Sequence, residues 1–252
     1  MRKSVEWDAR VFHNPNEHKV NNMDLDCSIY TDNAYLDTPK EYFGLVLDAI
    51  FNEVGEPTSL LDIGCANGAF LHHARKRFTN TKLDGLEPIS HLASLANRNV
   101  KTAKFHNRGL LDVTNSDESL HSEVVTMLGV LYLFRDPEEV ICRLMEMVQP
   151  KGGCFIFGSF NEEPIDILTN YRRAPNGDWV SAHNLFSMAT MENICTGVGA
   201  TCRWRDFSLS VPIPKSQDPM RSWTEPFRGN PHHIIYGTNT FHTMKLLIIR
   251  KI

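Results

Sequence analysis

The most constraining stretch of this sequence is an apolar run that meets a glycine-containing turn and then a helical pattern. Residues 60–63 are typical of a buried strand, and Gly64 and Gly68 lie in the turn that follows. Over residues 70–78 the apolar side chains recur at every fourth position, on one face of a helix. A strand that turns into a helix through glycines brings backbone N–H groups close to a nucleotide-like ligand.

A second short strand, residues 83–87, ends in the acid Glu87. In an open α/β sheet this acid lies beside the carboxyl end of the first strand, where it can accept hydrogen bonds from ribose hydroxyls. We therefore expect a nucleotide-type cofactor in a cleft between these two strands.

Strand and helix patterns alternate along the chain. Expected strands cover residues 60–63, 83–87, 103–105, 124–128 and 154–157, with two more near 200–211 and 241–249. Helices are expected to start at Thr38-Pro39-Lys40-Glu41, where Thr38 caps and Glu41 completes a capping box, at Pro88-Ile89-Ser90, at Asp136-Pro137 and at Ser187. This alternation is typical of a doubly wound α/β protein with a parallel sheet and helices on both faces.

The domain organisation follows from where the alternation is interrupted. No linker or internal repeat divides the chain, so we expect a single domain over residues 1–252. Residues 1–37 are predicted to form an N-terminal arm or lid. Residues 161–186 and 212–240 show no clear period and are predicted to be irregular insertions on the substrate side.

Composition excludes some partners. Lys and Arg total 26 against 30 Asp and Glu, a net charge of −4, which argues against a nucleic-acid partner. The sequence has no apolar run long enough to span a bilayer, which argues against a membrane partner. Six cysteines without a CxxC or zinc-like spacing indicate reduced thiols, no metal site and a cytoplasmic protein.

Four ordered motifs carry a family resemblance. They are Leu61-Asp62-Ile63-Gly64-Cys65-Ala66-Asn67-Gly68, Gly85-Leu86-Glu87-Pro88, the Met127–Pro137 segment and Val148-Gln149-Pro150-Lys151-Gly152-Gly153. Over about residues 30–210 the chain resembles the class I S-adenosylmethionine-dependent methyltransferases, in particular their UbiG-like small-molecule branch. It departs from the pattern at Ala66, which replaces the middle glycine of the loop and adds one methyl group; we expect binding to tolerate it.

The resemblance implies a Rossmann-like sheet of seven strands, mostly parallel with the last strand antiparallel. It also implies S-adenosyl-L-methionine as cofactor and S-adenosyl-L-homocysteine as product. Asp62 and the glycine loop would hold the methionine part, Glu87 the ribose, residues 109–111 the adenine, and residues 128–132 would lie near the sulfonium. The implied cofactor residues are Tyr30, Asp62, Gly64, Cys65, Asn67, Gly68, Glu87, Pro88, Gly109, Leu110, Leu111, Leu128, Gly129 and Tyr132.

Three residues are candidates for catalysis: Tyr132, His183 and His233. A hydroxyl nucleophile must lose a proton, so a general base would help its methylation. Each candidate has a structural alternative, because Tyr132 also suits a cavity wall and a histidine in a loop is commonly a surface residue. Arg172-Arg173 and Arg228 could bind an anionic substrate or form a solvated basic loop.

The predicted function is methyl transfer to a small molecule, preferably to the hydroxyl of a metabolite or sugar-like compound. Methylation of a small amine and a non-catalytic, cofactor-binding protein are the alternatives. A nicotinamide-dependent oxidoreductase would need G-x-G-x-x-G, where this chain has Gly64, Ala66 and Ala69. The sequence leaves the oligomeric state open, with a homodimer as one alternative.

Overall fold

The computed structural model describes residues 34–114, 117–173, 175–215, 221–236 and 241–251. Its strands are β1 (Ser59–Ile63), β2 (Lys82–Leu86), β3 (Lys104–His106), β4 (Ser122–Leu128), β5 (Val148–Asn161), β6 (Asn170–Tyr171), β7 (Val180–Ser181), β8 (Phe186–Ser187), β9 (Ala200–Asp206), β10 (Trp223–Phe227), β11 (Asn230–Ile235) and β12 (Phe241–Lys251). Its α-helices are α2 (Ala34–Asp37), α3 (Glu41–Val54), α4 (Ala69–Arg77), α5 (Ser90–Asn99), α6 (Pro137–Met147) and α7 (Met188–Gly197), with short 3₁₀ turns at Leu110–Asp112, Glu118–Leu120 and Leu131–Leu133.

The sheet confirms the predicted architecture. Its main path runs β10-β11-β12-β5-β4-β1-β2-β3, with β8 paired to β5 and β9 paired to β12. Strands β1 to β5 pair in parallel, whereas β12 is antiparallel to both of its long neighbours, β5 and β9. The sheet described has ten strands rather than the seven expected, because β8, β10 and β11 join it.

The hairpin β10–β11 corrects the prediction that residues 212–240 are irregular. Phe227 pairs with Asn230, so only Arg228 and Gly229 form the turn, and both have left-handed backbone with φ of 47° and 82°. This is the conformation of the two-residue turns that match the twist of a β-hairpin. The 161–186 insertion likewise contains a short antiparallel pair, β6–β7.

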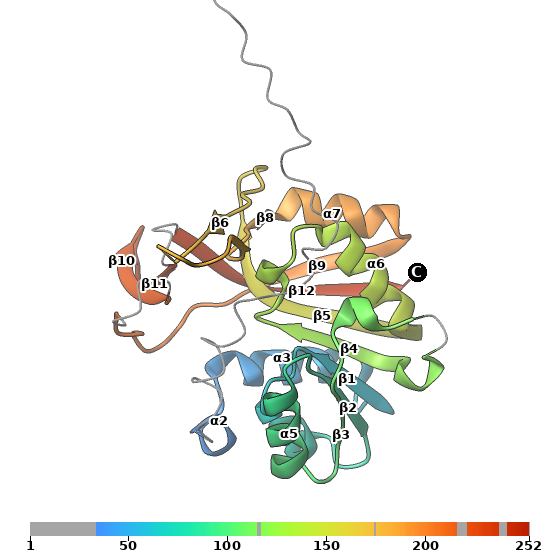
Figure 1. Ribbon diagram of the computed structural model, residues 1–252. Coiled ribbons are helices and arrows are strands. Elements are labelled where there is room, and N and C mark those ends of the chain that lie inside the picture. The colour runs from blue at the N-terminus through green and yellow to red at the C-terminus, as the bar shows by residue number, and fades with distance from the viewer. Residues whose placement is uncertain (1–33, 115–116, 174, 216–220, 237–240, 252) are drawn as a thin grey trace, which may run out of the picture.

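Helices cover both faces of the sheet (Figure 1). On one face, α3, α4 and α5 pack on a core that includes Phe43, Phe70 and Phe155. On the other face, α6 and α7 pack on a second core that includes Leu144 and Met191. The strands between these layers have side chains buried on both faces, as a parallel sheet requires.

Two of the proline-containing helix starts behave differently. The Asp136 side chain accepts hydrogen bonds from the N–H groups of Glu138 and Glu139, which confirms the cap predicted there. The start predicted at Thr38 is wrong, because α3 begins at Glu41 and no side chain caps it. The Glu41 carboxylate instead accepts a hydrogen bond from the backbone N–H of Ser210, at 2.8 Å.

Within the residues that the structure describes, none of the helices combines the length and apolarity needed to cross a membrane.

Candidate cofactor and acceptor site

The glycine loop is held tightly to the end of β2. The N–H groups of Gly64 and Cys65 both donate to the carbonyl oxygen of Leu86, at 2.9 and 3.1 Å. Gly64 has a φ of 71°, and a Cβ atom built on it would lie 2.6 Å from a methyl carbon of Val130. Backbone conformation and close packing therefore both require glycine at this position.

Glu87 shapes the loop as well as facing the cleft. One of its carboxylate oxygens accepts from the N–H of Ala66 and the other from the N–H of Ile89, both at 2.9 Å. Ala66 has a φ of 49°, the left-handed conformation that the replaced glycine would adopt without strain. Ala66 thus adopts the left-handed conformation of the glycine that it replaces, and the hydrogen bond from its N–H to Glu87 stabilises this conformation. Burial raises the pKa of the Glu87 carboxyl, although these two hydrogen bonds lower it.

Asp62 is the second buried acid of the cleft, with only 3% of its surface exposed. Its carboxyl accepts a hydrogen bond from the Thr126 hydroxyl at 2.7 Å. Burial, together with a smaller effect of the Glu87 charge, raises the pKa of Asp62 to about 7 although the hydrogen bond from Thr126 lowers it. A cationic ligand group would favour the ionised form of this pair.

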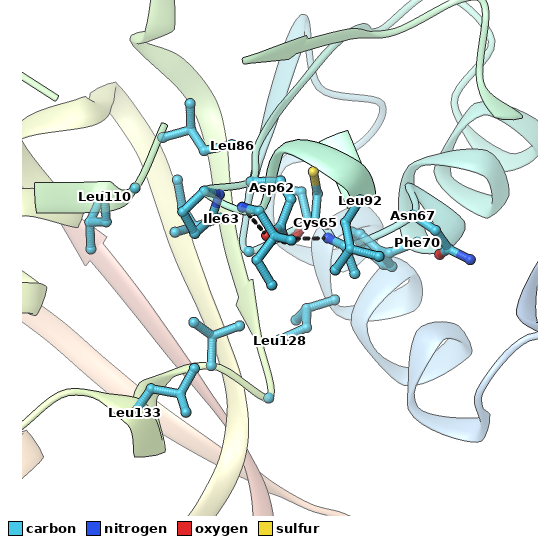
Figure 2. A pocket seen from close by; sticks show the side chains of 18 of the residues that line it. Asp62, Ile63, Cys65, Asn67, Phe70, Leu86, Leu92, Leu110, Leu128 and Leu133 are labelled. Carbon is cyan, nitrogen blue, oxygen red and sulfur yellow. Dashed lines mark hydrogen bonds between the residues drawn. The ribbon is translucent and has the colours of Figure 1, made fainter. Parts of the chain in front are cut away.

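A cavity of about 570 Å³ opens between these acids and the exit of β4. Figure 2 shows Leu110 and Leu133 on one side of it and Phe70 on the other. Its described lining includes most of the predicted cofactor residues: Asp62, Gly64, Cys65, Asn67, Glu87, Pro88, Gly109, Leu110, Leu111, Leu128, Gly129 and Tyr132. Gly68 is not among them, since it caps α4 with a φ of 82°, and Tyr30 lies outside the described residues.

Three further lining residues, Tyr35, Lys40 and Tyr42, were missed as cofactor-site residues by the sequence interpretation. The Lys40 ammonium lies 4.7 Å from the centre of the Tyr35 ring and 5.8 Å from that of Tyr42. An aromatic–basic–aromatic cluster around the start of a helix is a signal that could have pointed to them. These residues close the cavity on the side of α2 and α3.

A second cavity, of about 820 Å³, adjoins the first. Both cavities are lined by Leu128, Gly129 and Tyr132, so the exit of β4 separates them. The second cavity also receives His183, whose ring stacks on Tyr132 with centroids 5.4 Å apart and planes 13° apart. Two of the three catalytic candidates are thus brought together.

The third candidate, His233, lies elsewhere. It is on β11 opposite Glu225, with its ring 5.3 Å from that of Phe227, and it is not among the described residues that line either cavity. The basic candidates also separate: Arg173 lines the second cavity, whereas Arg172 lies over the Trp179 ring and Arg228 over the Phe227 ring.

Asn184 fixes His183 against the β4 exit. Its backbone N–H donates to the carbonyl oxygen of Tyr132 at 3.0 Å, and its side-chain amide donates to the carbonyl oxygen of Phe134 at 2.7 Å. Its amide oxygen accepts from the N–H of Thr169 at 2.9 Å. His183 itself has a φ of 60°, a strained conformation that only a well-held loop maintains.

Replacing Asn184 with alanine should therefore disorder the second cavity while sparing the first. The change leaves the carbonyl oxygen of Phe134 and the N–H of Thr169 without this partner, at a cost of about 2–4 kcal/mol in unfolding free energy. Turnover should fall while the affinity for S-adenosylhomocysteine, measured by calorimetry, stays within about two-fold. Asn97→Ala, which removes one amide hydrogen bond within α5, is the matched control. Equal losses of cofactor affinity and turnover would contradict this role.

His242 is a buried histidine that the sequence did not single out. Only 3% of its surface is exposed, and neither ring nitrogen has a hydrogen-bond partner among the described residues. Its ring lies 4.2 Å from that of Tyr236, a residue of the second cavity. Burial lowers the pKa of His242 to about 3, with smaller contributions from His183 and His233, so the ring is neutral near pH 7.

The comparisons with known proteins agree with this fold. The chain belongs to the family described as a methyltransferase domain, whose model matches residues 36–203. As a member of that family it is a methyltransferase rather than an oxidoreductase. No match was found among curated protein sequences.

Solved structures show the same fold at low sequence identity. DesVI of Streptomyces venezuelae is 15% identical, with 93% of this chain and 100% of that chain covered and a TM-score of 0.56. The 1,6-didemethyltoxoflavin-N1-methyltransferase of Burkholderia thailandensis, solved with 1,6-didemethyltoxoflavin and S-adenosylhomocysteine, is 14% identical. There 92% of this chain and 88% of that chain are covered, with a TM-score of 0.57.

Proposed function

We propose that this methyltransferase transfers a methyl group to the hydroxyl of a small metabolite, as a member of the UbiG-like branch. S-adenosyl-L-methionine is the methyl donor. When bound, it supplies a methyl group already activated for in-line displacement by its sulfonium. The observation that carries the hydroxyl assignment is the His183 ring stacked on Tyr132 at the boundary of the two cavities.

The residues of the first cavity fit this cofactor. Its volume of about 570 Å³ lies in the range of small-molecule sites. Buried carboxyls suit the cationic and hydroxyl-bearing parts: Asp62 would hold the amino end, and Glu87 has lone pairs left for the ribose. The apolar walls at Leu110 and Leu111 would hold the adenine, and Cys65 packs against Gly85, where an added Cβ would meet its sulfur at 2.7 Å.

The chain's own contribution to the reaction is orientation and proton transfer. Gly129 and Tyr132 line both cavities and would hold the acceptor oxygen in line with the methyl group, away from water. The Nδ1 atom of His183 is buried, so Nε2 is the nitrogen that would take the hydroxyl proton. An amine acceptor can react without this base, and N-methylation is the alternative.

The first experiment is calorimetric titration of the full chain with S-adenosylmethionine and S-adenosylhomocysteine, with NADH as control. Binding of both sulfur ligands and not of NADH, followed by release of S-adenosylhomocysteine in the presence of hydroxylated acceptors, is the expected result. Methylation of amines but of no hydroxyl would favour the alternative. Absence of binding would overturn the cofactor assignment. We further propose that the enzyme is cytoplasmic, acts on a small molecule and has no nucleic-acid or membrane partner. A homodimer is one alternative for its oligomeric state.

Glu87→Ala should weaken binding of S-adenosylhomocysteine by about 1–3 kcal/mol, since charged hydrogen bonds to the ribose are lost. The same change also frees the N–H groups of Ala66 and Ile89, so the loop itself could account for a loss of affinity. An analogue without the ribose hydroxyls separates the two effects: its affinity should change much less. Equal losses for both ligands would assign Glu87 to the loop alone.

Tyr132→Phe and His183→Gln test the catalytic side. Both variants should keep their affinity for S-adenosylhomocysteine. His183→Gln should lower kcat for a hydroxyl acceptor by about 10²–10⁴-fold and remove the fall of kcat at low pH that protonation of the base causes, because the general base is lost. Tyr132→Phe should lower kcat less, if its hydroxyl orients the acceptor. Turnover equal to that of the unchanged enzyme would make Tyr132 a cavity wall.

A further inference from the structure

The second cavity combines a wall of aromatic rings with cationic side chains. The wall consists of Tyr132, His183 and Tyr236, which all line the cavity. His183 stacks on Tyr132, and the Tyr236 centroid is 5.2 Å from His183 and 6.2 Å from Tyr132. The planes of Tyr132 and His183 are 13° apart, and the Tyr236 plane is tilted by 56° and 63° to them, so the cluster presents both ring faces and ring edges. Such a surface favours a planar ring, by offset stacking or edge-to-face packing.

Two arginines from different segments line the same cavity. Arg173 belongs to the loop between β6 and β7, and Arg221 precedes β10. Neither is among the described residues that line the first cavity. The planar guanidinium group matches a carboxylate or phosphate in two parallel hydrogen bonds, which gives both affinity and orientation.

The remaining charges of the cavity lie on the α2–α3 segment. Asp37, Lys40 and Glu41 line it there, and the Glu41 carboxylate already accepts the hydrogen bond from Ser210. This hydrogen bond and others from the same segment lower the pKa of Glu41 despite burial. Asp37 and Glu41 therefore lie on the α2–α3 side of the cavity, where the positive charge of Lys40 offsets one of their two negative charges. Both arginines come from the insertions instead.

We propose that the acceptor is a hydroxylated planar aromatic compound that carries an anionic group, either a carboxylate or a phosphate. Its ring packs on the wall of Tyr132, His183 and Tyr236, and its anionic group is held by Arg173 and Arg221. This inference rests on the proposed function, because it names the substrate class of the same site. It makes the two insertions, 161–186 and 212–240, the part of the chain that selects the substrate.

The test is binding of four probes to the full chain loaded with S-adenosylhomocysteine. The anionic aromatic probes are 4-hydroxybenzoate and 4-hydroxyphenyl phosphate, which also distinguish the two anions. The neutral control is 4-hydroxybenzamide, and the non-planar control is trans-4-hydroxycyclohexanecarboxylate. At least one anionic aromatic probe should bind about ten-fold more tightly than either control, as expected for one charge-assisted contact.

Substitutions of single residues test which side chains are responsible for the preference for anionic aromatic probes. Arg173→Gln and Arg221→Gln should each weaken the preferred anionic probe about ten-fold and leave the affinity for S-adenosylhomocysteine unchanged. Arg172→Gln is the matched control, because Arg172 lies over the ring of Trp179. Tyr236→Leu should reduce the preference for the aromatic probe over the cyclohexane acid.

The outcomes separate this inference from the proposed function. Anionic aromatic probes that bind no better than the controls, or not at all while S-adenosylhomocysteine binds, would overturn the substrate class. Equal effects of Arg172→Gln and Arg173→Gln would do the same. Methylation of neutral or aliphatic hydroxyls with equal efficiency would overturn this inference and leave the proposed function intact, whereas failure to bind S-adenosylhomocysteine would overturn the proposed function itself.

Discussion

Gly64→Ala is expected to lower the unfolding free energy by about 2–4 kcal/mol and to weaken cofactor binding at least about ten-fold. The left-handed backbone would cost an alanine about 1–2 kcal/mol, and forcing a methyl group into tight packing costs a further 1–3 kcal/mol. The methyl group would lie 2.6 Å from Val130, which lines the cavity with Gly64. Urea unfolding and calorimetry with S-adenosylhomocysteine measure the two effects.

Two further variants separate the cost of the left-handed backbone from the cost of the steric contact with Val130. Gly199→Ala has a comparable φ of 66° but no atom within 4 Å of the new methyl group, so it should show the backbone cost alone. Val130→Ala combined with Gly64→Ala should recover the packing part of the loss. A Gly64→Ala variant no less stable than Gly199→Ala would contradict the packing argument. Ala66→Gly, by the same reasoning, should be tolerated, since it relieves a left-handed alanine.

His242→Leu is expected to stabilise the protein, by about 1–3 kcal/mol near neutral pH, because it removes two buried nitrogens without hydrogen-bond partners. The gain should grow as the pH falls. The pKa of His242 is about 3 in the folded protein and 6.5 when unperturbed, so between these values the unfolded chain binds the proton. The contribution of His242 to stability is therefore lost as the pH falls through this window, at about 1.4 kcal/mol per pH unit.

The contribution of Asp62 to stability depends on pH in the opposite sense. The quantity to measure is therefore the difference in unfolding free energy between His242→Leu and the unchanged protein. The folded-state pKa of Asp62, about 7, lies above the ordinary 3.8, so its contribution falls as the pH rises between these values. Both proteins contain Asp62, and subtraction removes it. The advantage of His242→Leu in urea unfolding should be about 2 kcal/mol larger at about pH 5 than above pH 6.5. The same advantage at both pH values would show that His242 is not buried neutral; His91→Gln, at an exposed position, is the control.

The first half of the fold could be predicted because its signals are local. Strands buried on both faces are apolar along their whole length, and the turns between them contain the glycines or prolines that end each element. The residues proposed for the cofactor could be predicted for the same reason, because Asp62, the glycine loop and Glu87 lie in consecutive strands and turns of the chain. Most of the cofactor residues predicted line one cavity.

The acceptor side could not be predicted to the same extent, since its structure depends on distant contacts. Pro226 and Pro231 lie within β10 and β11, and because prolines are uncommon within paired strands, the local sequence does not favour strands there. The Arg228-Gly229 turn was the local signal available. The start of α3 was mispredicted because the Glu41 carboxylate binds Ser210, far along the chain, rather than its own helix.

The position of β12 bears on when the enzyme can become active during its synthesis. This strand lies between β5 and β9, and its first residues pair with β11, which carries part of the acceptor cavity. A nascent chain that stops short of residue 241 lacks the strand with which β5, β9 and β11 all pair, so β9 and the β10–β11 hairpin have no strand to join. The wall of the second cavity is thus completed only when the final strand has been inserted, and we expect methyl transfer to begin only then.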